Sequence, residues 1–231
     1  MKRSEINDII REGDAFIRSF GYRMPPFAYW SPQELRARAA TDSRAIVDGS
    51  LGWDITDFGS GDFARTGLFL FTVRNGSAQD LKNACGMLYA EKIMIARRDQ
   101  LTPMHHHIVK AEDIINRGGG NLVLQLFNVA GDGSVDTAGD IEVAADGSLR
   151  RLKAGEHLKL APGESVTLLP HHWHAFWGEN GDVLVGEVST VNDDRTDNIF
   201  RDSVGRFAQI EEDGDPLHLL VSDYEQWLQT A

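Results

Sequence analysis

The chain has 231 residues and a formal net charge of −12 at pH 7. With 42% hydrophobic and 25% charged residues, it can bury a sizeable core, and its composition is unlike that of a disordered chain. Nucleic acid and anionic membrane surfaces are disfavoured as partners, because both require clustered Lys and Arg and the sequence has no basic run.

The sequence also predicts a cellular compartment. No apolar run approaches the roughly 20 residues that a bilayer-spanning helix needs. The first ten residues, MKRSEINDII, lack the apolar stretch of a signal peptide, and the only cysteine, Cys85, cannot form an intramolecular disulfide. We therefore expect a protein of the reducing cytoplasm.

Two helices are expected near the N-terminus. Apolar residues recur at helical spacing between Ser4 and Gly21, where Ser4 suits the helix start and Gly21 the end. Further on, Ser31 and Glu34 have the spacing of a capping box, which indicates a second short helix. Residues 1–45 are thus predicted to be a helical extension.

After about residue 45 the pattern changes to short β-prone runs separated by Gly, Asn and Asp turn residues. The predicted strands lie within residues 67–76, 86–97, 121–133, 141–152, 157–170 and 182–191. Because no helical pattern lies between them, we expect an antiparallel sandwich or barrel. A last strand and a helix capped by Ser222 would complete one domain over residues 1–231.

The first of two histidine clusters consists of His105, His106 and His107. Side chains alternate between faces along a strand, so His105 and His107 share one face and His106 points to the other. Glu112 lies five residues beyond His107. Because this separation is odd, a turn or bulge must intervene if the carboxylate is to reach the same face.

The second cluster, PHHWHAF, follows about sixty residues later. His172 and His174 share a face there, and His171 opposes them. One ligand from this strand would complete a shell of three histidines and one carboxylate with open positions, which suits catalytic Mn, Fe, Co, Ni or Zn. Seven of the eight histidines lie between residues 105 and 174, which favours a metal site over isolated structural histidines.

The first cluster resembles the first motif of the cupin family, in which HxH is followed by Glu and then Gly. His105, His107, Glu112 and Gly119 satisfy this pattern, although Asp99 stands where the family has a leading Gly. The resemblance implies an all-β double-stranded β-helix, or jelly roll. It also implies a divalent metal bound by this motif.

The second cluster resembles the second cupin motif. Counting from Gly163 places the metal histidine at His174, in preference to His172, although Leu169 and His171 stand where the family has Pro and Gly. Together the two motifs imply four metal ligands: His105, His107, Glu112 and His174.

The likeness extends beyond these motifs. Residues 1–7, 51–59, 110–120 and 186–200 resemble the cupin-type D-lyxose isomerases, so that the resemblance covers nearly the whole chain. It implies one divalent metal, typically Mn²⁺ with Co²⁺, Fe²⁺, Ni²⁺ or Zn²⁺ as alternatives, and interconversion of D-lyxose and D-xylulose, with some activity on D-mannose and D-fructose. Exposed edge strands and the N-terminal helix favour a homodimer.

Aldose–ketose isomerisation moves a proton between C1 and C2, so it needs a Lewis acid for the oxygens and a group that carries the proton. Lys110 lies between His107 and Glu112 in the chain, so we expect it near the metal, as proton carrier or as a charge that stabilises the enediolate. Glu187 lies on the strand after the second motif, where antiparallel pairing can bring it to the same place. For both, the alternative is a solvent-exposed residue.

A hydroxyl-rich sugar also needs fixed donors and acceptors, for which Asp193, Arg206 and Glu211 are the candidates. The glycines Gly118–Gly120 suggest a tight turn that requires positive φ.

Three other functions fit the cupin motifs. These are an Fe²⁺-dependent dioxygenase, a sugar-phosphate isomerase and a non-catalytic sugar-binding protein. The second would need a cationic phosphate site, for which Lys110, Arg117 and Arg206 are available. Oxygen uptake identifies the first, and binding without turnover identifies the third.

Overall fold

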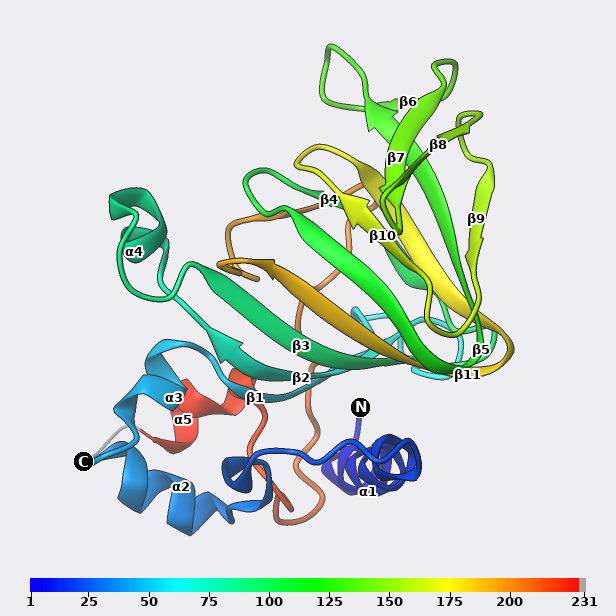
Figure 1. Ribbon diagram of the computed structural model, residues 1–231. Helices are drawn as coiled ribbons and strands as arrows, with labels where there is room; N and C mark the ends of the chain where they lie inside the picture. Colours follow the sequence, from blue (N-terminus) through cyan, green and yellow to red (C-terminus); the bar gives the residue numbers. More distant parts are fainter. Residues whose placement is uncertain (229–231) are drawn as a thin grey trace.

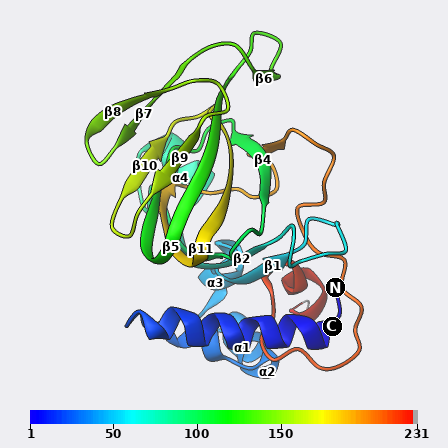
Figure 2. The ribbon, with the colours of Figure 1, turned by 90° about the vertical axis from the view of Figure 1, so that its right-hand side faces the viewer.

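The computed structural model describes residues 1–228 and shows two facing antiparallel β-layers, with helices covering the outer side of one of them (Figures 1 and 2). The helices are α1 (Arg3–Ser19), α2 (Pro32–Ala39), α3 (Arg44–Asp48), α4 (Ala78–Asn83) and α5 (Tyr224–Trp227), with 3₁₀ turns at Pro26–Tyr29 and Val221–Asp223. The strands are β1 (Gly52–Thr56), β2 (Leu68–Asn75), β3 (Tyr89–Ala96), β4 (Thr102–His107), β5 (Glu112–Val129), β6 (Val135–Asp136), β7 (Ile141–Ala145), β8 (Ser148–Leu152), β9 (His157–Leu160), β10 (Ser165–Leu168), β11 (Trp173–Thr190) and β12 (Asn198–Phe200).

The long strands β5 and β11 belong to both layers. The second half of β11 pairs with β3 and with the first half of β5, which in turn pairs with β10. The first half of β11 pairs with β4 and with the second half of β5, which pairs with β9. All of these pairings are antiparallel. This is the jelly roll predicted from the sequence, with helices added at the N-terminus.

The glycine run predicted as a tight turn lies instead inside β5, where the strand passes from one layer to the other. Gly118 and Gly119 do have positive φ, 148° and 101°. A Cβ on Gly119 would collide with the carbonyl oxygen of Asp182 on β11. Glycine is therefore needed both for its backbone conformation and for the close approach of the two strands.

Strand β2 shows why the fold has two cores. Leu68 and Leu70 point into the space between the β-layers, whereas Phe69 and Phe71 point to the outer side, where α1 covers them. Both faces are thus buried, so the strand is a continuous apolar run without the usual polar alternation. The apolar stripe of α1 supplies the cover (Figure 2).

The expected helix caps are only partly confirmed. Ser31 and Glu34 form the predicted capping box of α2. However, α1 begins at Arg3, and Ser4 instead donates its hydroxyl to Asp213 of the C-terminal segment.

The predicted last strand is reduced to a single bridge between Leu220 and Trp53. A 3₁₀ turn follows it, in which Asp223 accepts from the backbone N–H of Leu220, so the prediction that Ser222 caps a helix was wrong. No helix within residues 1–228 is long and apolar enough to cross a membrane.

Candidate metal centre and active-site cavity

Three histidines converge between the two β-layers. His105 and His107 lie on β4 and His174 lies on β11, where it pairs directly with His105. All three are buried, and one ring nitrogen from each lies within 4.8 Å of the others. The alternation predicted for β4 holds, because the His106 ring lies on the other side, 4.4 Å from the ring of Trp173.

Backbone carbonyls fix the orientation of two of these rings. The Nδ1 atom of His105 lies 2.8 Å from the carbonyl oxygen of Pro103, and that of His174 lies 3.0 Å from the carbonyl oxygen of His172. A carbonyl can only accept, so each Nδ1 carries the hydrogen and each neutral ring keeps a lone pair on Nε2. Metal-binding histidines in proteins are oriented in this way.

Electrostatics also favours neutral rings. Burial, with the neighbouring His174, lowers the pKa of His105 well below its ordinary value. Burial and the charge of Lys110 lower the pKa of His107. Both rings are thus neutral at pH 7, the form in which imidazole binds a metal.

Glu112 completes the cluster. The loop at residues 108–111 separates it from β4, as the odd spacing required, and its Oε1 atom lies 3.2 Å from the Nε2 atoms of both His107 and His174. Within residues 1–228, Oε1 of Glu112 and Nε2 of His107 are buried without a hydrogen-bond partner. Converging unpartnered acceptors of this kind fit a divalent cation. We call His105, His107, Glu112 and His174 the histidine group.

The structure brings His174, not His172, to this group. His172 is half-buried at the turn before β11, and its Nδ1 atom accepts from the backbone N–H of Leu169.

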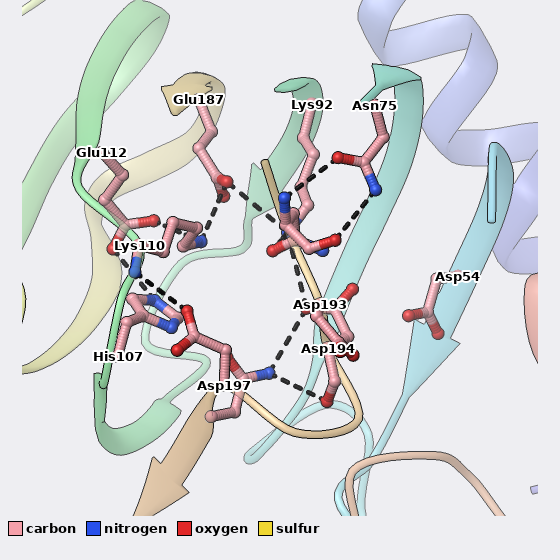
Figure 3. Close-up of polar contacts among 12 residues, drawn as sticks. Asp54, Asn75, Lys92, His107, Lys110, Glu112, Glu187, Asp193, Asp194 and Asp197 are labelled. Carbon is pink, nitrogen blue, oxygen red and sulfur yellow. Dashed lines mark hydrogen bonds and ion pairs between the residues drawn. The ribbon is translucent and has the colours of Figure 1, made fainter. Parts of the chain in front are cut away.

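Lys110 and Glu187 lie next to the histidine group, as predicted (Figure 3). The Nζ atom of Lys110 lies 2.6 Å from Oε2 of Glu112 and donates to Oε1 of Glu187 at 3.0 Å. All three side chains are buried. Burial lowers the pKa of Lys110, but the charges of Glu112 and Glu187 outweigh it and hold that pKa above its ordinary value. Lys110 is therefore a charged ammonium at neutral pH.

A second set of charges continues from Glu187. Lys92, its cross-strand neighbour on β3, places Nζ 3.5 Å from both Glu187 and Asp194. The Nη2 atom of Arg206 lies 3.0 Å from Asp194 and 2.8 Å from Asp54. We call Asp54, Lys92, Asp194 and Arg206 the arginine group. Burial raises the pKa of the Asp194 carboxyl, but Arg206 and Lys92 outweigh it and hold the pKa well below its usual range.

Sequence reasoning missed three members of the arginine group. Lys92 carried a usable signal, because it is a charged residue inside an apolar β-run and predicted strands pair in register. Asp54 and Asp194 carried none that distinguishes them from surface acids. Of the predicted substrate-binding residues, only Arg206 lines the cavity.

Asp193 and Glu211 do not line this cavity. Asp193 is exposed and accepts the backbone N–H groups of Arg195 and Thr196 within its own turn. Glu211 is exposed on the helical side of the molecule, where its backbone pairs with Lys2. Arg117 lies on the outer side of β5, against Gly186 of β11, and also does not line the cavity.

The histidine group, Lys110 and Glu187 line one cavity together with Lys92, Asp194 and Arg206. Its remaining walls are mostly apolar and aromatic: Phe58, Leu68, Leu70, Met94, Thr102, Ile114, Phe176, Asn198 and Phe200. A polar solute in this cavity would meet a continuous series of charged side chains beside apolar walls.

Comparisons with known proteins assign this arrangement to a family. The D-lyxose isomerase family model matches residues 1–224. The chain belongs to the D-lyxose isomerase family. Its relatives include the D-lyxose/D-mannose isomerase of Serratia proteamaculans, which is 49% identical over 231 residues, covering 99% of this chain and 100% of that protein. The D-lyxose/D-mannose isomerase of Escherichia coli O157:H7 is 46% identical, covering 98% and 100%.

Solved structures support the fold of this family member. The L-ribose isomerase of Cellulomonas parahominis with L-psicose superposes with a TM-score of 0.55 at 18% identity, covering 91% of this chain and 98% of that one. The L-ribose isomerase of Acinetobacter sp. DL28 in complex with L-ribose gives 0.54 at 17%, with the same coverage. At these identities the likeness establishes only the fold. With the family match, it identifies the chain as a sugar isomerase of jelly-roll fold.

Proposed function

We propose that this enzyme interconverts D-lyxose and D-xylulose, and also D-mannose and D-fructose, by moving a proton between C1 and C2 through an enediol. The observation that carries the proposal is the meeting of unpartnered acceptors of Glu112 and His107 with the Lys110–Glu187 pair in one buried cavity. The family membership and the printed activity of the relatives, D-lyxose/D-mannose isomerase, support the choice of substrates.

We propose one divalent metal, Mn²⁺, as the cofactor. Its ligands would be the histidine group, whose imidazole nitrogens and carboxylate oxygen also suit Co²⁺, Fe²⁺, Ni²⁺ and Zn²⁺. When bound, such a cation supplies the Lewis acidity that stabilises negative charge on sugar oxygens.

We assign different roles to Lys110 and Glu187. Lys110 keeps its proton at neutral pH, so it stabilises developing negative charge on a sugar oxygen and does not act as the base. The Glu187 carboxylate carries the proton between C1 and C2. The hydrogen bond from Lys110 fixes one Glu187 oxygen, which restricts the rotation of the carboxylate inside the cavity.

The charge balance of the cavity favours a neutral sugar over a sugar phosphate. Lys92, Lys110 and Arg206 are its cationic lining residues within residues 1–228, and each already lies within 3.5 Å of two carboxylates. A phosphate dianion would have to compete with those carboxylates. In contrast, the unpartnered Nη1 of Arg206 and Oδ1 of Asn198 can donate to and accept from hydroxyl groups.

The proposal is tested with protein stripped by EDTA and then given Mn²⁺ or no metal. D-lyxose, D-mannose, D-xylose and D-mannose 6-phosphate are offered separately, ketose formation is followed by chromatography, and oxygen uptake is recorded in parallel. We expect metal-dependent ketose from D-lyxose and D-mannose, none from D-xylose, and no oxygen uptake. Ketose only from the phosphate ester, or oxygen uptake without ketose, would contradict the proposal. The expected homodimer stays a prediction that light scattering can check.

A further inference from the structure

The segment at residues 191–197, between β11 and β12, links the arginine group to the loop that carries Lys110. It contributes Asp194 to the cavity, and the backbone N–H of Asp197 donates to the carbonyl of Asp193, which closes the segment into a turn. Figure 3 shows Asp193, Asp194 and Asp197 on this segment, with Asp197 next to Lys110. At its other end, Asn192 is held by Asn75 of β2 through hydrogen bonds of 2.9 Å in both directions.

Asp197 accepts three consecutive backbone N–H groups of the neighbouring loop. Its Oδ1 atom accepts from Ile108 at 3.0 Å and from Val109 at 2.8 Å, and its Oδ2 atom accepts from Lys110 at 3.0 Å. Asp197 is only 8% exposed, and no Lys or Arg within residues 1–228 forms an ion pair with it. The buried charge is therefore compensated by these N–H groups, which makes the three bonds stronger than neutral ones.

Apart from Asp197, the backbone of this loop is held at Ala111, which donates its N–H to the hydroxyl of Thr190 and accepts from the Thr190 N–H. The side chains of Ile108 and Val109 are 44% and 61% exposed, so they contribute little packing. Lys110 is the buried member of the three, and its ammonium must sit between Glu112 and Glu187. A loop with few buried contacts depends on its hydrogen bonds for a defined conformation.

We propose that Asp197 is a positioning residue that acts through Lys110. It fixes the backbone of residues 108–110 so that the Lys110 ammonium reaches Glu187, and thereby ties the loop of Lys110 to the segment of Asp194. This inference rests on the role proposed above for Lys110. It predicts that loss of Asp197 impairs turnover without removing the metal ligands.

The test compares Asp197→Ala with Asp193→Ala. Asp193 lies in the same segment, but its side chain is exposed and contacts only its own turn, so it is a matched control. With D-lyxose and Mn²⁺, we expect Asp197→Ala to lower kcat by about 10- to 100-fold, the usual effect of losing a supporting group around a metal site, with KM and bound Mn²⁺ near wild type. Asp193→Ala should retain kcat. Equal losses in both variants would overturn the proposal.

A double-mutant cycle separates positioning from general damage. If Asp197 acts through Lys110, then adding Asp197→Ala to Lys110→Ala should cause no further loss of kcat. If the losses of kcat from the two single variants multiply in the double variant, the inference is overturned. The proposed function would still stand in that case, because the wild-type enzyme turns over D-lyxose. An inactive wild type would instead refute the proposed function, and the inference with it.

Two further measurements keep the test decisive. If Asp197→Ala does not fold, Asp197→Asn retains one accepting oxygen and should show a smaller loss of kcat, also absent in the Lys110→Ala background. Amide hydrogen exchange at residues 108–110 measures the hydrogen bonds to Asp197 directly and does not depend on turnover. It should speed up in Asp197→Ala or Asp197→Asn, and unchanged protection would overturn the proposal.

Discussion

The histidine group lines the cavity together with Lys92, Asp194 and Arg206 of the arginine group, but the two groups balance their charges in different ways. In the histidine group, neutral imidazoles and one carboxylate converge with acceptors that have no hydrogen-bond partner within residues 1–228. In the arginine group, Arg206 already pairs with Asp54 and Asp194, and Lys92 pairs with Asp194. The first arrangement offers converging ligands to a cation from outside the chain, whereas the second contains its own cations, although burial raises the pKa of Asp54. This contrast supports our proposal that the histidine group serves the chemistry and that the arginine group binds hydroxyl groups.

The largest effect is expected when the histidine group is broken. His174→Ala should abolish stable Mn²⁺ binding and lower kcat/KM by about 1,000-fold, because a Lewis acid contributes several kcal/mol to the transition state. His172→Ala is the matched control, since that side chain lies two residues away and contacts the turn before β11. The measurements are the metal content per chain and the initial rate on D-lyxose for both variants. Equal metal content in both variants would contradict the ligand assignment.

The second-largest effect is expected at Glu187, which lies between the histidine group and the arginine group. Glu187→Gln keeps the shape of the side chain but removes its basicity, so kcat should fall by about 100- to 10,000-fold with little change in KM. Solvent deuterium should no longer enter the sugar at C1 or C2. Glu91→Gln serves as the control, because Glu91 does not line the cavity and pairs with Arg74. A Glu187→Gln variant that still exchanges deuterium at the wild-type rate would rule out Glu187 as proton carrier.

A smaller effect is expected in the arginine group. Arg206→Lys keeps the positive charge beside Asp54 and Asp194 but loses the second guanidinium nitrogen, Nη1, as a donor. We expect KM for D-lyxose to rise about 10-fold, the value of a hydrogen bond involving a charged group, with kcat less affected. Arg201→Lys, which is exposed and pairs with Asp202, should leave both parameters unchanged. A fall in kcat alone would place Arg206 with the chemistry.

The smallest effect is on stability against acid. Asp194 has a pKa well below its usual range, because Arg206 and Lys92 outweigh its burial. Such a group stabilises the folded state above its unfolded pKa of about 4 and loses this contribution as pH falls towards its folded pKa. The free energy of unfolding in urea should therefore fall less steeply below pH 4 in Asp194→Asn than in wild type. Parallel curves would show that the arginine group is not charge-balanced as described.

The histidine group could be predicted from the sequence because its members follow from local strand alternation and motif spacing. Alternation along β4 places His105 and His107 together, and motif spacing selects His174. Lys110 could not be far from its neighbours in the chain. The spacing of strands and turns predicted an antiparallel sandwich or barrel, and the cupin motifs specified the jelly roll. Strand β12, only three residues long, was too short to show an alternating pattern.

The arginine group could not be predicted from the sequence, because its assembly depends on the register of strands far apart in the chain and on irregular loops. Lys92 meets Glu187 only through the pairing of β3 with β11. Asp193 was chosen over Asp194 because no periodicity applies in a turn, where adjacent side chains can point in unrelated directions. Glu211 was misplaced because nothing in its sequence shows that the C-terminal segment returns along the N-terminus.

The most direct test of the central claim is a Mn²⁺ titration of the stripped wild-type protein, with bound metal and the rate of D-xylulose formation from D-lyxose measured on the same samples. Our account predicts that the rate rises in proportion to bound Mn²⁺ and levels off at one ion per chain, and that His174→Ala shows neither binding nor rate. Full activity in protein with no bound metal would contradict it.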